Sequence, residues 1–78
     1  MVEKPVNLNS ENVYEIVVSG SIDLFRLMEF GGVDVRPEVD GSRRHRTLFR
    51  IVTDQTGMVG LIRRMHGLGI VLLSISQV

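Results

Sequence analysis

The period of the apolar residues changes along the chain in an order that strongly limits its fold. Four segments with period two and with β-branched or aromatic residues are predicted strands: 13–19, 33–39, 44–53 and 70–76. Two segments with helical spacing, 22–30 and 55–68, are predicted helices with Ser21 and Asp54 as their N-caps. The predicted order is therefore strand, helix, strand, strand, helix, strand.

This order predicts an α+β fold of the ferredoxin-like βαββαβ type. Right-handed crossovers place both helices on one face of a four-stranded antiparallel sheet, with the strand order 4-1-3-2. Pro37 cannot donate to a β-ladder, so the strand at 33–39 is expected at a sheet edge, as this order requires. Asp40-Gly41 predicts a two-residue type I′ turn after that strand.

The length of 78 residues leaves room for one core only. Residues 1–12 include Pro5 and have no apolar period, so they are predicted to form a flexible tail before a single domain at 13–78. The chain has no cysteine, which excludes disulfides and thiolate chemistry. It also has no apolar run of membrane-spanning length. We expect a cytoplasmic protein that does not bind membranes.

A sheet with both helices on one side leaves its other face open. Alternation places Tyr14, Ile16 and Val18 toward the helices and Val71, Leu73 and Ile75 beside them. Four apolar residues are expected on the open face and form the predicted oligomer interface: Val17, Leu48, Val52 and Leu72. The first helix, which is apolar around most of its circumference, is a second candidate surface. The chain is predicted to be a homo-oligomer, most simply a dimer, unless its own tail covers the apolar patch.

Six arginines and a single acid, Asp54, lie between residues 43 and 64, although the whole chain has zero net charge. This balance argues against a dedicated DNA-binding protein. Arg43, Arg44 and Arg46 have two interpretations: a solvated hairpin end, or a contact for an anion or an acidic partner. RNA binding through this hairpin is a third functional hypothesis, but the outward positions of the adjoining strand carry no aromatic ring. Nucleic acid is therefore an unlikely partner.

Catalytic and metal-binding motifs are missing from the sequence. It contains no phosphate-binding Walker loop, no dinucleotide fingerprint and no His-Glu-x-x-His. His45 and His66 have no acidic residue at a ligand spacing, so no metal site is predicted. We therefore expect a protein that is not an enzyme and that has no cofactor.

The segment Asp54-Gln55-Thr56-Gly57-Met58-Val59-Gly60-Leu61-Ile62, followed by Leu68-Gly69-Ile70 and an apolar strand, resembles the strand-turn-helix-strand signature of ACT regulatory domains. Thr56 stands where that signature usually has proline, and the matching unit is the second half of the fold rather than the first. The whole chain is also similar to small stand-alone bacterial proteins with a Tyr-x-Ile-Val opening and an Asp-Gln before the last helix.

The ACT resemblance implies ferredoxin-like topology and oligomerisation through sheet edges or faces. It also implies a small-molecule site at the turn formed by Asp54, Gln55, Thr56 and Gly57, near a subunit interface. The same residues have a simpler explanation, as a capping Asp and a turn Gly, which is the more common role of such residues. Two functions follow as hypotheses: a non-catalytic interaction or regulatory module that acts as an oligomer or accessory subunit, and an ACT-like small-molecule sensor.

Overall fold

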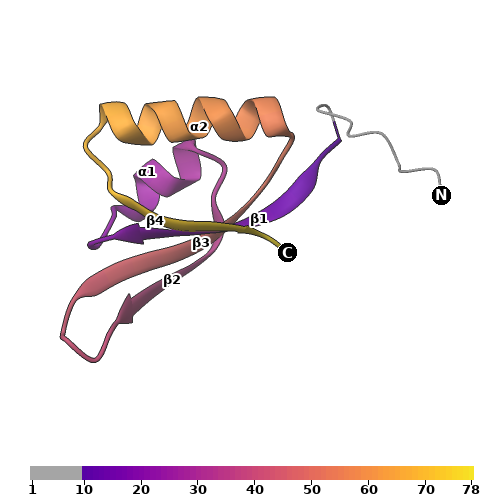
Figure 1. Cartoon of the computed structure of the whole chain (residues 1–78). Coiled ribbons are helices and arrows are strands. Elements are labelled where there is room, and N and C mark those ends of the chain that lie inside the picture. The colour runs from indigo at the N-terminus through magenta and orange to yellow at the C-terminus, as the bar shows by residue number, and fades with distance from the viewer. Residues whose placement is uncertain (1–9) are drawn as a thin grey trace.

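Four strands and two helices alternate as β-α-β-β-α-β in the computed structural model, which describes residues 10–78 (Figure 1). Their bounds are β1 Asn12–Ser19, α1 Leu24–Glu29, β2 Val33–Val39, β3 His45–Thr53, α2 Gln55–Gly67 and β4 Leu72–Gln77. Residues 1–9 of the predicted tail lie outside the described residues. Asn12, the last residue of that predicted tail, belongs to β1. The class is α+β, as predicted.

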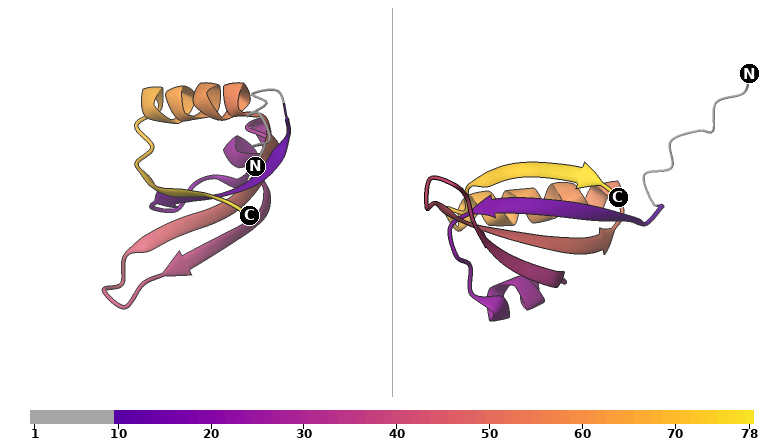
Figure 2. Two further views of the ribbon diagram at one scale, coloured as in Figure 1. Left: turned by 45° about the vertical axis from the view of Figure 1, so that its right-hand side comes forward. Right: turned by 90° about the horizontal axis from the view of Figure 1, so that it is seen from below.

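The strands form one antiparallel sheet in the order β2-β3-β1-β4. The predicted order 4-1-3-2 describes the same neighbours, counted from the β4 edge. β2 lies at an edge, where the missing N–H of Pro37 leaves the ladder intact. Both helices lie on one side of the sheet, which leaves its other side uncovered (Figures 1 and 2).

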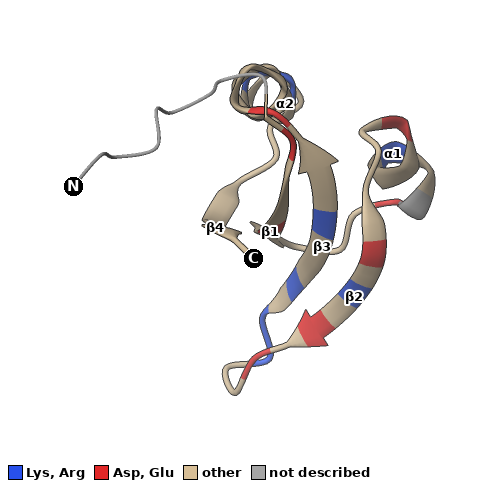
Figure 3. Ribbon diagram, turned by 90° about the vertical axis from the view of Figure 1, so that its right-hand side faces the viewer, with Lys and Arg blue, Asp and Glu red and all other residues tan. Residues whose placement is uncertain are grey.

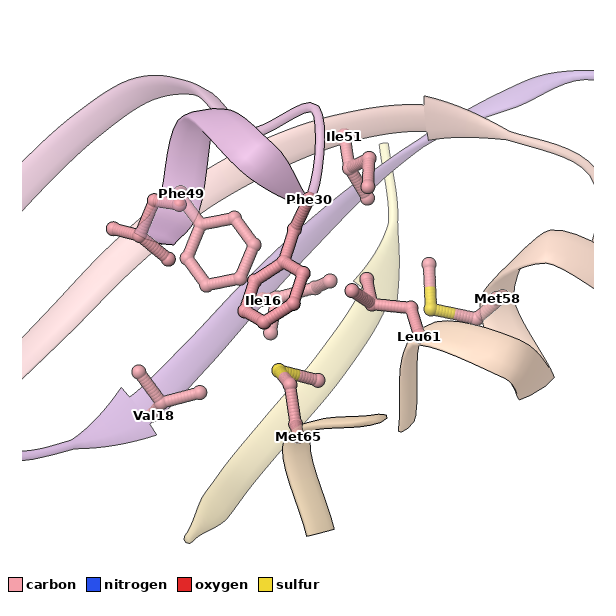
Figure 4. Close-up of a cluster of buried hydrophobic side chains, with 9 residues drawn as sticks. Ile16, Val18, Phe30, Phe49, Ile51, Met58, Leu61 and Met65 are labelled. Atoms are coloured by element: carbon pink, nitrogen blue, oxygen red, sulfur yellow. The ribbon is translucent and has the colours of Figure 1, made fainter. Parts of the chain in front are cut away.

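The core lies between the helices and the two central strands (Figure 4). Phe49 and Ile16 are fully buried at its centre, and α2 contributes Met58, Leu61 and Met65 from one side of the helix. Burying a side chain of this size contributes about 1.5–3 kcal/mol. Because both helices and both central strands contribute to this cluster, it holds the two helices to the same face of the sheet.

The first helix is shorter than predicted, and Ser21 does not cap it. Asp23 is the N-cap, and its carboxylate accepts the N–H of Phe25 at 3.0 Å. Ile22 lies outside the helix, where its N–H donates to the hydroxyl of Thr47, 3.4 Å away, and its side chain packs against the core. The helix therefore begins two residues later than predicted.

The faces predicted for the last strand are wrong for its first residues, although Ile75 packs against the core as predicted. A register shift between Val17 and Val18 pairs Ile16 with Ile75 but Val18 with Leu72. Leu72 and Ile75 are three residues apart, yet both pack against the core, whereas Val71 and Leu73 are exposed. Such a bulge adds one residue to one strand and breaks strict alternation. Leu72 is therefore not part of the open face.

The predicted type I′ turn at Asp40-Gly41 is also wrong. The N–H of Asp40 donates to the carbonyl of Arg44, and the N–H of Arg43 donates to the carbonyl of Asp40, both at 3.0 Å. This leaves a three-residue loop in which Arg43 alone has the left-handed φ of 60°. The Asp40 carboxylate accepts the N–H groups of Ser42 and Arg44, so a side chain stabilises the wider loop.

Candidate functional site: the open face of the sheet

The candidate site is the sheet face opposite the helices. Alternation along β1 and β3 brings three cross-strand pairs to this face: Val13 with Val52, Glu15 with Arg50, and Val17 with Leu48. We refer to these six residues as the open-face band. Val52 is 54% exposed, and the other three apolar members are half-buried by their neighbours within the sheet. The band therefore offers aliphatic surface on both sides of a central charged pair.

The central pair of the band is an ion pair. The guanidinium of Arg50 lies 3.5 Å from the carboxylate of Glu15, and each side chain is about one-third exposed. Ion pairs of this exposure contribute about 0–1 kcal/mol to stability. The ion pair therefore matters less for stability than for recognition, because it places one positive and one negative group at fixed points between two apolar patches.

Three of the four residues predicted for an oligomer interface lie in this band. Val17, Leu48 and Val52 share the open face, while Leu72 packs on the opposite side. Sequence reasoning missed Val13. Its position four residues before Val17 in the same strand, hence on the same face, is the signal that could have found it.

The basic cluster at the β2–β3 hairpin is locally compensated (Figure 3). Arg46 donates from Nε to the carboxylate of Glu38 at 2.8 Å. Arg43 and Arg44 are exposed in the loop, where Asp40 lies next to them in the turn. The acidic side chains of the hairpin therefore lie on β2 and at Asp40, and the basic cluster lies on the loop and β3, where Arg46 is paired with Glu38.

The turn predicted to bind a ligand caps α2. The Asp54 carboxylate accepts the N–H of Gly57 at 2.6 Å, which places a negative charge at the positive end of the helix. A Cβ at position 57 would overlap the hydroxyl oxygen of Thr53. Glycine therefore allows the first turn of α2 to pack closely against the end of β3. Because the protein's own carboxylate occupies this helix end, a bound anion would have to compete with it.

A groove begins next to this turn, between the end of α1, the end of β3 and one side of α2. Its volume is about 500 Å³, and its lining includes Phe30, Gly57, Gly60 and Arg64. The guanidinium of Arg64 lies over the Phe30 ring, 4.8 Å from its centroid. Of the four residues predicted to bind a ligand, only Gly57 lines this groove. Arg64 was missed, because sequence alone placed it on the solvent side of the helix.

Two further findings concern the described part of the chain only. Within residues 10–78, no three His, Asp or Glu side chains come close enough together to hold a metal ion. His45 and His66 lie in β3 and α2, respectively. No helix in this region has the length and apolar character needed to cross a membrane.

A comparison with protein families finds one match, to a domain of unknown function (DUF8691), over residues 13–76. The chain belongs to the DUF8691 family. The matched residues run from the second residue of β1 to the penultimate residue of β4, so the DUF8691 domain includes the whole sheet, both helices and the open-face band. No curated protein matches the sequence.

Proposed function

We propose that this DUF8691 protein is a non-catalytic interaction module that acts as an oligomer, with the open face of its sheet as the contact surface. The observation that carries the proposal is the open-face band, an aliphatic surface that neither helix covers. Exposed apolar surface that is bordered by charged groups is a common feature of protein contacts. The βαββαβ order with both helices on one side also supports the ferredoxin-like assignment.

The arrangement of the band favours a second copy of the chain as the partner. Sheets that pack face to face bring the side chains of their two inner faces together. A two-fold axis through the centre of the band can place Glu15 of each copy opposite Arg50 of the other. The apolar pairs on either side of the charges then meet each other. One surface thus supplies both halves of a charge-complementary contact.

Sedimentation equilibrium at micromolar concentration tests this proposal. The native chain should have a mass above the 8.8 kDa of one chain. The double variant Val17→Glu/Val52→Glu should weaken association at least about tenfold, or 1.4 kcal/mol, because it introduces like charges into the contact. Val59→Glu is the matched control, since Val59 is 42% exposed on α2, away from the open face.

Two outcomes would overturn the proposal. The first is a native chain that remains at 8.8 kDa. The second concerns α1, where Phe25 and Met28 are 76% and 61% exposed. Association lost through Phe25→Glu and retained in the open-face variant would move the contact to α1.

The groove beside α2 favours a second function, that of a small-molecule sensor. Arg64 brings a cation to a groove that Phe30 and Leu61 also line, which suits a ligand with an apolar body and a carboxylate. A thermal-shift screen with amino acids and small carboxylates tests this idea. A ligand at one hundred times its dissociation constant adds about 2.7 kcal/mol of stability. The shift should disappear in Arg64→Gln, and a screen in which no compound shifts the native protein rejects this function.

A further inference from the structure

The edge strand β4 has none of the charged residues or prolines that usually keep a further strand from pairing with a sheet edge. From Ile70 to Val78 the chain has no charged residue and no proline, and β4 carries no charge in Figure 3. Natural edge strands are usually protected by charges, prolines or bulges. The bulge of β4 lies at the start of the strand, opposite Val17 and Val18, and the residues from Ser74 to Gln77 pair regularly with β1.

The free side of β4 offers backbone hydrogen-bonding groups. The N–H of Val78 donates to the carbonyl of Val13 at 2.9 Å, so Val78 is directed toward β1. In an antiparallel ladder successive residues bond on opposite sides. The N–H and C=O groups of Ile75 and Gln77 are therefore directed away from the sheet. They form a template for one more antiparallel strand.

Apolar surface adjoins this template. Val71 and Leu73 are 59% and 54% exposed at the start of β4. A groove of about 390 Å³, lined by Ile62, Met65, Ile70 and Leu72 among others, lies between α2 and the same end of the strand. A strand added at this edge would thus gain side-chain burial in addition to backbone hydrogen bonds.

We propose that β4 pairs antiparallel with β4 of a second copy, so that two four-stranded sheets join into one. In a two-fold contact, a charged residue near the axis lies close to the same residue of the second copy, and the two like charges repel each other. A strand without charge avoids this repulsion, whereas the three charged residues of β2, Asp34, Arg36 and Glu38, would meet it. The absence of this repulsion at β4 favours a second copy, joined through β4, as the occupant.

The proposal deepens the proposed function, on which its biological meaning rests, and it uses a different surface. A two-fold axis perpendicular to the sheet keeps the helices of both copies on one side. The open-face bands of the two copies then lie on the same face of the joined sheet. Edge pairing would double the contact surface that each assembly presents.

Three variants separate this edge contact from the open-face contact. Leu73→Lys adds a charge to the β4 edge, and Gln77→Pro removes an outward N–H as Pro37 does in β2. Val39→Lys is the matched control, because Val39 is an equally exposed apolar residue on the β2 edge strand. Each variant is made in the Val17→Glu/Val52→Glu background, and its mass is measured by sedimentation. Circular dichroism establishes that each variant folds.

We expect a two-chain species in the background protein and in the Val39→Lys control, and a single chain after Leu73→Lys or Gln77→Pro. Amide hydrogen exchange supplies a second measurement that needs no variant. The N–H groups of Ile75 and Gln77 should become protected as the concentration of the native chain rises. Association with no protection at these two amides, or a background protein that is already a single chain, overturns the edge proposal. Either result leaves the open-face contact to its own test.

Discussion

β2 and β4 are the two edges of one sheet, and they differ in how a further strand could approach them. Asp40 bonds to Arg44 across the hairpin, so by alternation the nitrogen of Pro37 faces the free side of β2, where it has no hydrogen to donate. Asp34 has a φ of 52°, and the register with β3 shifts between Val33 and Arg36. β4 also has a register shift, where it pairs with β1, but it has no proline and no residue with a left-handed φ. Protection against pairing is therefore a local property of each edge strand.

The two edges are also held to the sheet in different ways. β2 is joined to β3 by a hairpin that the Asp40 carboxylate stabilises, and the Arg46–Glu38 ion pair connects the two strands at 2.8 Å. β4 is held by the apolar packing of Leu72 and Ile75 under the helices. Substitutions of polar residues should therefore act mainly on the β2 side, and substitutions of apolar residues on the β4 side.

The largest effect is expected from Phe49→Ala, which asks whether the two edges depend on one core. Phe49 is fully buried on β3, and its loss should lower the free energy of unfolding by about 3–5 kcal/mol. For so small a domain this is a large part of the total. Urea denaturation followed by hydrogen exchange checks the result. If β4 amides stay protected while β2 amides exchange, the edges belong to separate folding units and the comparison fails.

Thr47→Val should have the next largest effect, on the β2 side of the sheet. The buried hydroxyl of Thr47 donates to the carbonyl of Gly20 at 2.8 Å and accepts the N–H of Ile22. Valine preserves the shape of the side chain but leaves both groups without this partner, which should cost about 1–3 kcal/mol. Thermal denaturation measures the loss. Thr47→Ser keeps the hydroxyl and should lose less, so equal losses would contradict the hydrogen-bond explanation.

Arg43→Gly should stabilise the hairpin next to the β2 edge. Arg43 has a φ of 60°, a left-handed conformation that costs a residue with a Cβ about 1–2 kcal/mol and costs glycine little. The gain should be about 1 kcal/mol, because the greater freedom of glycine in the unfolded chain offsets part of it. The melting temperature reports this change, and Arg44→Gly serves as a control. A lower melting temperature for Arg43→Gly would rule out strain at this position.

The smallest change in stability is expected for Pro37→Thr, which tests the edge comparison most directly. Position 37 is exposed, so stability should change by no more than about 0.5 kcal/mol. The new N–H faces the free side of β2 and opens a second edge to pairing. Light scattering should then detect assemblies larger than those of the native chain. An unchanged mass would mean that the charges and the register shift protect β2 without the proline.

The accuracy of the sequence predictions differs between parts of the molecule. The six elements, the edge position of β2 and the Asp54 cap were predictable because they depend on periodicity, on the chemistry of proline and on a side chain close to the helix end. The start of α1 was not, because two nearby residues, Ser21 and Asp23, can both cap a helix and Asp23 is the one that does. The contact of Arg64 with Phe30 joins two helices whose separation no local pattern defines.

By itself, the sequence determined which segments become strands and helices and that the strand with Pro37 lies at a sheet edge. Each of these properties follows from neighbours within a few residues. Only the tertiary structure decided that Leu72 faces the core while Val71 and Leu73 face outward. The physical reason is that a bulge arises from the pairing of two strands distant in the sequence, and a one-residue shift exchanges the faces of every residue beyond it.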